Sequence, residues 1–264
     1  MKLKLGLIGC GNMGSAILNG AFKSGVCASS HVWVTDKIQA KAREFSQLNK
    51  CRLASDAAQV VQKADVILLA VKPQDLAETA SSIRPFLNSQ KIIISILAGV
   101  KLEKLKKQLA PAIVVRTMPN LGAQVGAAVT AICSSNAKAR NITSKIFSAC
   151  GRAVILNEKY FDAVTAVSGS GPAYFFLIME LLESFALAKG IPAAAARELA
   201  VQTARGAGML ASESDDAPAV LRQKVTSKKG TTDAALSVLK YRGFHKMFFA
   251  ALQAAVKRSS QLSR

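Results

Sequence analysis

Short apolar runs alternate with helix-like spacing through the first 157 residues. The runs occupy residues 4–8, 31–35, 66–71, 91–96, 113–116, 129–133 and 153–156, while apolar residues recur at helical intervals in 16–22. Residues 101–107 form a short amphipathic pattern with a basic face. Continuous apolar strands separated by helices are typical of a parallel sheet covered on both faces. We therefore predict a doubly wound, Rossmann-type α/β domain over residues 1–157.

The pattern changes to helix from about residue 157. Pro172 suits a first helical turn and Gly190 a helix end, which predicts a helix between them. Further helices are predicted over 191–209, 217–225, 233–240 and 244–260. An apolar stripe such as Phe175, Phe176 and Met179 is typical of a core or a subunit interface. We predict a second, all-helical domain over residues 158–264.

A glycine motif joins the first predicted strand to the first predicted helix. It reads Gly9-Cys10-Gly11-Asn12-Met13-Gly14 and follows Ile8 directly. In such a motif one glycine makes a tight turn, one lets the backbone approach a pyrophosphate, and one allows close helix–strand packing. The new helix directs free N–H groups at the phosphates. We predict that Ile8 and the whole motif bind a dinucleotide.

The choice of dinucleotide depends on the residues after the second predicted strand. The Asp36 carboxylate would accept hydrogen bonds from the adenosine ribose and repel a 2′-phosphate, which favours NAD(H). Lys37, Lys41 and Arg43 follow, and each is able to meet that phosphate instead. The preference between NADP(H) and NAD(H) stays open. Further cofactor contacts are predicted where the next strands end, at Ala70-Val71-Lys72-Pro73 and Leu97-Ala98.

The chain is strongly basic, with a formal charge of +19 at pH 7. Such a field suits an anionic cofactor and a carboxylate substrate, and nucleic acid is the other obvious partner. The Lys and Arg residues are dispersed, without interleaved aromatic residues. We therefore predict no nucleic-acid partner.

Cysteine, histidine and apolar content argue against several other classes. The 5 cysteines are scattered without a CxxC pair, which is typical of reduced thiols and not of a disulfide framework or zinc site. His31 and His245 are too few for a histidine metal site or a catalytic triad, so we predict no metal. The most apolar stretch, 163–182, contains two glycines, Pro172 and Glu180, and we expect these to interrupt a membrane span. A cytoplasmic protein without a membrane partner is predicted.

Six motifs occur along the chain in a characteristic order. They are the glycine motif at 9–14, Ala70-Val71-Lys72-Pro73-Gln74, Arg116-Thr117-Met118-Pro119-Asn120, the run SGSGPAY at 168–174, Val225-Thr226-Ser227 and Gly230-Thr231-Thr232. Together they resemble pyrroline-5-carboxylate reductase over nearly the whole chain. The resemblance implies an oxidoreductase that uses NAD(P)H to reduce the C=N bond of Δ1-pyrroline-5-carboxylate to L-proline, the last step of proline biosynthesis. It also implies a dimer, or a multiple of dimers, formed through the helical domain.

The resemblance also assigns the substrate site. Gly230-Thr231-Thr232 precedes the helix predicted from Asp233, so its N–H groups are placed to bind a carboxylate at a positive helix end. By similarity Thr232 is the catalytic residue, whose hydroxyl would hydrogen-bond the ring nitrogen as it gains a proton. Simple capping of the helix by the threonines is the alternative. Ser227 is predicted to bind substrate in the same loop.

Three further substrate residues are predicted in the first part of the helical domain. Ser168 and Gly169 would let the backbone come close to the nicotinamide and the substrate ring, with a tight interdomain turn as the alternative. Glu158 matches a family position near the substrate, although it also fits an ordinary surface acid.

The chain departs from the family pattern at three places. Lys228-Lys229 stands where Pro-Gly is usual, Ala57 where an asparagine is usual, and Lys224 where an amide side chain is common. Two other functions stay open: a related imine reductase or β-hydroxyacid dehydrogenase with another substrate, and a non-enzymatic NAD(P)-binding regulatory protein.

Overall fold

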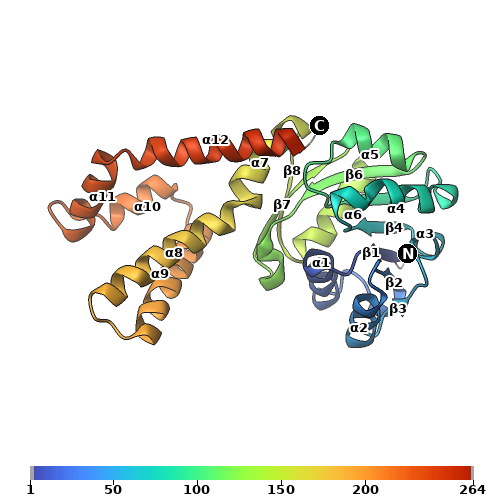
Figure 1. Cartoon of the computed structure of the whole chain (residues 1–264), viewed down its shortest axis with the longest axis horizontal. Coiled ribbons are helices and arrows are strands. Elements are labelled where there is room, and N and C mark those ends of the chain that lie inside the picture. The colour runs from blue at the N-terminus through green and yellow to red at the C-terminus, as the bar shows by residue number, and fades with distance from the viewer. Residues whose placement is uncertain (1–2, 263–264) are drawn as a thin grey trace. The chain divides into compact units, whose positions relative to one another are not determined.

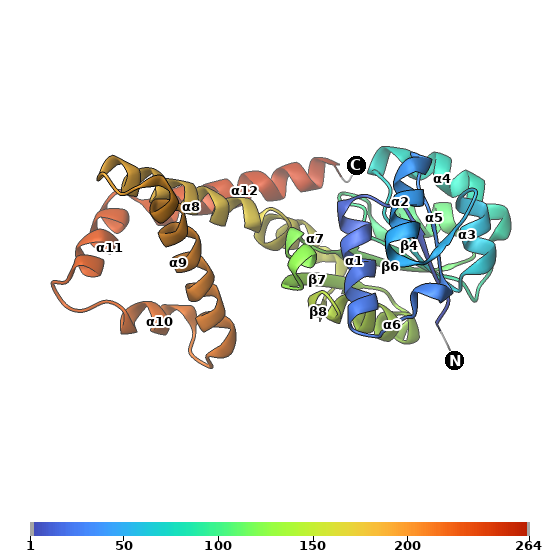
Figure 2. The same ribbon diagram turned by 90° about the horizontal axis from the view of Figure 1, so that it is seen from below.

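The computed structural model describes residues 3–262, and contacts divide them into two units. One unit comprises residues 3–170 together with 255–262, and the other comprises 171–254. Each unit is described by itself (Figures 1 and 2). The predicted domain boundary between residues 157 and 158 stays a prediction.

The first unit is built on one sheet with the strand order β3-β2-β1-β4-β5-β6-β7-β8. All neighbouring strands run parallel except β6 and β7, which pair antiparallel. The strands are β1 (Leu5–Ile8), β2 (Val32–Thr35), β3 (Arg52–Leu53), β4 (Val66–Leu69), β5 (Ile92–Ser95), β6 (Ile113–Met118), β7 (Ala128–Cys133) and β8 (Gly151–Ile155). The order reverses direction between β1 and β4, which makes the carboxyl ends of these two strands the expected ligand crevice.

Helices cover both faces of this sheet because the central strands are apolar on both sides. Alternate residues of β4 enter two separate cores: Val66 and Leu68 enter one, and Ile67 and Leu69 the other. The first core is closed by α1 (Asn12–Lys23), α2 (Gln39–Asn49) and α6 (Ala137–Ser148). The second is closed by α3 (Ala57–Lys63), α4 (Leu76–Ile83) and α5 (Leu102–Leu109). The predicted doubly wound α/β fold is confirmed.

Residues 158–170 lead from the sheet into the second unit through helical segments. A 3-10 turn (Glu158–Tyr160) is followed by α7 (Phe161–Val164) and a π-helical turn (Thr165–Gly169). Among residues 3–262, one stretch, Glu158–Ala188, is long and apolar enough by length and composition to cross a membrane. The prediction that the two glycines and Pro172 interrupt this apolar stretch was wrong. The Ser170 N–H donates to the Thr165 carbonyl at 2.8 Å, which continues the backbone hydrogen bonding through the π-helical turn. Pro172 is the second residue of α8 (Gly171–Ala188), in a first turn where no backbone N–H is needed.

The second unit contains helices throughout its described residues, as predicted. They are α8 (Gly171–Ala188), α9 (Ala193–Glu213), α10 (Pro218–Lys224), α11 (Thr231–Tyr241) and the first part of α12 (Phe244–Leu262). Gly190, with φ of 81°, ends α8 and lets α9 pack beside it. Many large apolar side chains of α8 are exposed, Phe175 at 66% and Phe185 at 65% among them.

Candidate active site

The glycine motif forms a cradle at the start of α1, with each glycine serving a different need. Gly9 has a φ of 104°, and a Cβ there would lie 2.5 Å from the Ala70 carbonyl oxygen. A Cβ on Gly14 would lie 2.5 Å from the Gly9 carbonyl oxygen. A Cβ on Gly11, in contrast, would meet nothing within 4 Å. Gly9 and Gly14 therefore permit the turn and the packing, and Gly11 leaves open space over the loop.

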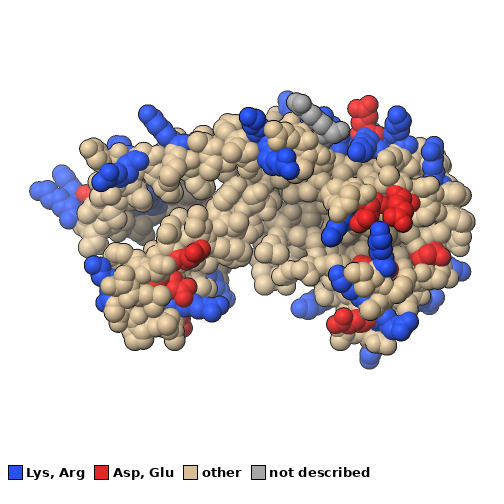
Figure 3. All heavy atoms as spheres, in the orientation of Figure 1, with Lys and Arg blue, Asp and Glu red and all other residues tan. Residues whose placement is uncertain are grey.

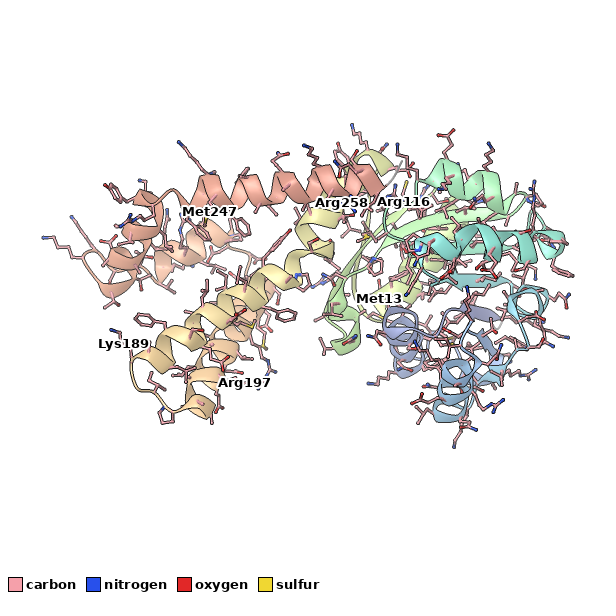
Figure 4. The ribbon with its side chains drawn as sticks, in the orientation of Figure 1. Met13, Arg116, Lys189, Arg197, Met247 and Arg258 are labelled. Atoms are coloured by element: carbon pink, nitrogen blue, oxygen red, sulfur yellow. The ribbon has the colours of Figure 1, made fainter. Side chains whose placement is uncertain are left out.

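This open space adjoins unpaired N–H groups of α1. Gly11 is the N-cap residue, and no side chain caps the helix. The first backbone bond of the helix is donated by Ser15 N–H to Gly11, so the N–H groups of Asn12, Met13 and Gly14 precede the ladder. Met13 is labelled at this helix end in Figure 4. A helix N-terminus that a phosphate is free to approach fits the pyrophosphate of a dinucleotide.

Asp36, at the end of β2, holds the glycine loop in place. One carboxylate oxygen accepts the Cys10 N–H at 2.6 Å, and the other accepts the Ile38 N–H at 2.8 Å. The predicted ribose-binding acid therefore lies beside the glycine loop, with each oxygen already accepting one backbone N–H. Each carboxylate oxygen has a second lone pair, so these bonds leave acceptor capacity for a ribose hydroxyl.

Lys37 faces two carboxylates that its position in the sequence did not suggest. Its Nζ lies 3.5 Å from Asp75 Oδ1 and 3.4 Å from Glu78 Oε2, and these acids raise the pKa of Lys37. Asp75 lies in the 3-10 turn Pro73–Asp75, and Glu78 lies in α4. Because neither acid is near Lys37 in sequence, no local pattern could have identified the pairing.

The remaining predicted cofactor residues lie along the same edge of the sheet. Ala70, after β4, donates its N–H to the Ile8 carbonyl at 2.8 Å, and Val71 is partly exposed beside it. Lys72 and Pro73 are exposed where the chain enters the 3-10 turn. After β5, Leu97 is buried and Ala98 is exposed; the Leu97 N–H donates to Ser95 Oγ at 3.3 Å. The structure thus brings the predicted cofactor residues together in one unit.

Ser168 and Gly169 lie in the π-helical turn, so the alternative of a simple tight turn was wrong. Ser168 Oγ donates to the Val164 carbonyl at 3.0 Å. A Cβ on Gly169 would lie 2.6 Å from Met118 Cε of β6, so glycine permits this close approach. π-turns inside helices are frequent at functional sites.

The second predicted group, Ser227 and 230–232, lies in the other unit at the start of α11. This helix begins at Thr231 and not at Asp233 as predicted, because Gly230 is the N-cap residue. Both threonines therefore lie in the first helical turn, and neither is the capping residue, which removes the capping alternative. The first backbone bond is donated by Ala234 N–H to Gly230, so the N–H groups of 231–233 precede the ladder.

A tight turn leads into this helix. The Gly230 N–H donates to the Ser227 carbonyl at 2.9 Å, and Lys229 has a φ of 60°. A left-handed residue at the third position is typical of a type II turn, whose preferred central pair is Pro-Gly. Asp233 Oδ2 accepts the Lys229 N–H at 2.9 Å, and a Cβ on Gly230 would lie 2.3 Å from Ser227 Oγ. The chain thus keeps the turn while placing lysines where Pro-Gly is usual.

Glu158 is engaged in the first unit, unlike an ordinary surface acid. Its Oε1 accepts the Leu102 N–H at 2.5 Å and a guanidinium N–H of Arg116 at 2.7 Å. Sequence reasoning named Arg116 within a motif but gave it no role. The buried guanidinium also lies 4.6 Å from the centre of the Phe161 ring. The predicted contact of Glu158 with the substrate stays a prediction.

Ala57 and Lys224 are the other two departures from the family pattern. Ala57 opens α3, where the Asp56 side chain caps the helix by accepting the Gln59 N–H at 2.8 Å. Lys224 at the end of α10 pairs with Asp216. Within residues 3–262, no group of three or more His, Cys, Asp or Glu side chains is arranged to hold a metal ion.

Comparisons with known proteins match the chain along its whole length. A family model described as pyrroline-5-carboxylate reductase dimerisation matches residues 158–262, and one described as NADP oxidoreductase coenzyme F420-dependent matches residues 4–99. Pyrroline-5-carboxylate reductase from Synechocystis is 38% identical over 267 residues, covering 100% of both chains. The same-named protein from Escherichia coli is 35% identical, also with 100% coverage of both.

Solved structures agree. A pyrroline-5-carboxylate reductase from Coxiella burnetii superposes with a TM-score of 0.94 at 32% identity, covering 100% of both chains. A pyrroline carboxylate reductase from Plasmodium falciparum, solved with NADP bound, gives a TM-score of 0.86 at 28% identity, over 99% of this chain and 98% of that one.

Proposed function

This chain belongs to the pyrroline-5-carboxylate reductase family, and from that membership we propose that it reduces Δ1-pyrroline-5-carboxylate to L-proline. The observation that carries the proposal is the match over the full length of the reductases, which includes both the cofactor-binding unit and the helical unit. The glycine cradle at α1 supports it independently, because open space over Gly11 and free N–H groups fit a dinucleotide.

The cofactor site comprises Ile8, the motif 9–14, Asp36, Lys37, residues 70–73, Leu97 and Ala98. When bound there, the nicotinamide supplies the hydride for the C=N carbon. The α1 N-terminus holds the pyrophosphate, and Asp36 lies where the adenosine ribose is expected. Lys37 faces Asp75 and Glu78, so a 2′-phosphate of NADP(H) would compete with these two carboxylates for the Lys37 ammonium group. NADP(H) and NAD(H) are both retained as cofactors.

The proposed substrate contacts fall in two groups: Ser168 and Gly169 in the first unit, and Ser227 with residues 230–232 in the second. The N–H groups at the start of α11 bind the substrate carboxylate at the positive end of the helix. The Thr232 hydroxyl, in the first turn and partly exposed, hydrogen-bonds the ring nitrogen. That nitrogen takes a proton, ultimately from water, as the carbon takes the hydride. A threonine is too weak an acid for more than positioning and relay, so orientation supplies most of the catalysis.

The helical unit forms the dimer interface. Support comes from the exposed apolar side chains of α8, including Phe175, Phe176 and Phe185, which a monomer would leave in water. The same helix carries Glu180 and Glu183, which disfavour insertion in a lipid bilayer. On the face shown in Figure 3, Lys and Arg side chains are scattered and do not form one patch. We therefore retain a cytoplasmic enzyme without nucleic-acid or membrane partners.

The test is the oxidation of NADPH and of NADH with Δ1-pyrroline-5-carboxylate as substrate. Thr232→Ala should lower kcat about tenfold to a hundredfold, because the hydrogen bond to the developing amine is lost. Thr203→Ala, at an exposed position of α9, is the matched control and should leave turnover unchanged.

Two other outcomes would contradict parts of the proposal. Unchanged kcat in Thr232→Ala would remove this residue from the mechanism while keeping the enzyme. No turnover by a folded wild-type protein that still binds NADPH would refute the reductase assignment.

A further inference from the structure

The loop between β5 and α5, residues 96–101, is fixed at its first end by buried polar side chains. Thr117 Oγ1 of β6 donates to the Ser95 carbonyl at 2.9 Å, and Ser95 Oγ accepts the Leu97 N–H at 3.3 Å. Ser95 and Thr117 are 0% and 1% exposed. These bonds determine where the chain leaves the sheet.

The second end of the loop is fixed by Glu158. The N-cap residue of α5, Lys101, provides no side-chain cap. Glu158 instead supplies the carboxylate that accepts the first N–H of the helix, from Leu102, at 2.5 Å. A negative charge at this position also opposes the positive end of α5. A residue distant in sequence therefore serves as the helix cap.

Arg116 holds the carboxylate in that position. Arg116 is 5% exposed; its guanidinium donates to the same Oε1 at 2.7 Å and packs against the Phe161 ring. Figure 4 labels Arg116 on β6, the strand that also supplies Thr117. Removing Glu158 would leave the buried Arg116 guanidinium without its carboxylate partner. Removing Arg116 would leave the Glu158 carboxylate, on a side chain that is 32% exposed, with the Leu102 N–H as its remaining partner.

The middle of the loop is also supported. Gly99 has a φ of 72°, and a Cβ there would lie 3.1 Å from Leu262 Cβ at the end of α12. The loop thus has a defined conformation along its length, while Ala98 remains exposed. A loop at the carboxyl end of a parallel strand, next to the switch point, lies where a bound dinucleotide is expected.

We propose that Arg116 and Glu158 are positioning residues that fix the loop 96–101 for cofactor binding, and that Glu158 acts there and not as a substrate ligand. The inference rests on the proposed function, because it requires Leu97 and Ala98 to contact the cofactor. Each residue acts through another: Arg116 orients Glu158, and Glu158 holds the start of α5.

Three variants separate the contributions. Glu158→Ala removes both hydrogen bonds, whereas Glu158→Gln keeps an oxygen for the Leu102 N–H but loses the ion pair. Arg116→Lys keeps the positive charge but loses the planar guanidinium group with its fixed N–H donors. The matched control is Asp65→Asn, which breaks the Lys91–Asp65 ion pair (3.9 Å). These two residues directly precede β4 and β5, so they lie at the amino ends of the strands, away from the loop 96–101 at the carboxyl ends.

Three readouts apply: the Kd for NADPH by fluorescence without substrate, the KM for Δ1-pyrroline-5-carboxylate at saturating NADPH, and the hydrogen exchange of the 97–102 amides. Glu158→Ala should raise the Kd for NADPH at least about tenfold, because a misplaced loop no longer matches the cofactor. The Leu102 amide should exchange faster, and the substrate KM should change less than about twofold. Glu158→Gln and Arg116→Lys should fall between Glu158→Ala and wild type, and Asp65→Asn should match wild type.

Several outcomes would overturn the inference. A raised substrate KM with an unchanged Kd for NADPH would make Glu158 a substrate ligand. Faster exchange at Leu102 with unchanged Kd and KM would reduce the pair to a structural support. Failure of the reductase assignment is separately visible, because wild type would then lack turnover while the Kd and exchange measurements still test the loop.

Discussion

Lys229 provides a sharp test of the turn that precedes α11. Its φ of 60° places a side chain in the left-handed region, where an L-residue costs about 1–2 kcal/mol relative to glycine. Glycine at this position would relieve that strain, but its greater freedom in the unfolded chain costs about 0.4–1 kcal/mol. We therefore expect Lys229→Gly to increase the free energy of unfolding by about 0.5–1 kcal/mol.

The chain contains a matched control for this substitution. Lys50, which follows α2 in the other unit, has a φ of 53°. Lys50→Gly makes the same chemical change and removes the same charge, so it should stabilise by a similar amount. The free energy of unfolding is measured by urea denaturation at one fixed protein concentration, because self-association contributes to stability.

The two variants should differ in their kinetics. Lys229 lies beside the N–H groups that we propose bind the substrate carboxylate, and Lys50 does not. Loss of one exposed charge is worth at most about 1 kcal/mol, so Lys229→Gly should raise the substrate KM by up to about fivefold at low salt. Lys229→Asn, which tolerates the left-handed region, isolates the charge effect from the backbone effect. Destabilisation by Lys229→Gly alongside stabilisation by Lys50→Gly would refute the left-handed turn.

Three further predictions follow from the glycine cradle, the cysteines and α8. Gly11→Ala should raise the Kd for NADPH with little change in unfolding free energy, because its Cβ would enter open space; Gly14→Ala should destabilise the fold, since its Cβ would lie 2.5 Å from a carbonyl oxygen. Equal destabilisation by both would contradict the separate roles. Burial, followed by the charge of Asp36, raises the pKa of the Cys10 thiol from 9.0 to about 12. Because the folded state keeps this proton longer, its contribution to stability is present below pH 9 and is lost between pH 9 and about 12. Urea denaturation against pH should show that decline, and it should be shallower in Cys10→Ala. Phe175→Glu should weaken self-association in analytical ultracentrifugation, because the side chain is exposed on the proposed interface; Leu48→Glu, exposed on α2, is the control. Equal effects of the two would count against α8 as the interface.

The strands of the sheet other than β3 could be predicted because each is a nearly continuous apolar run. β3, the exposed edge strand Arg52–Leu53, carries no such signal and was missed. A strand that is covered on both faces needs apolar side chains at every position, whatever its distant contacts, as in β4 and β5. The motif also predicted that its glycines serve separate needs, although the close neighbour of Gly9, the Ala70 carbonyl, is supplied by a strand distant in sequence. The antiparallel pairing of β6 with β7 could not be predicted, since an apolar run has the same composition in either direction. Likewise, the start of α11 depends on the turn at Gly230 and not on the apolar spacing that follows it.

By itself the sequence determined the fold class and the family, because these are written in local patterns and in motifs of fixed order; the residues of the two candidate sites stay predictions. Only the tertiary structure decided how charged groups are paired. Glu158 meets Arg116 and the Leu102 N–H across separations of 42 and 56 residues, and Lys37 meets Asp75 across 38. Charged side chains are long and match any opposite charge nearby, so sequence spacing alone does not select their partners; the packing of the sheet and its helices does.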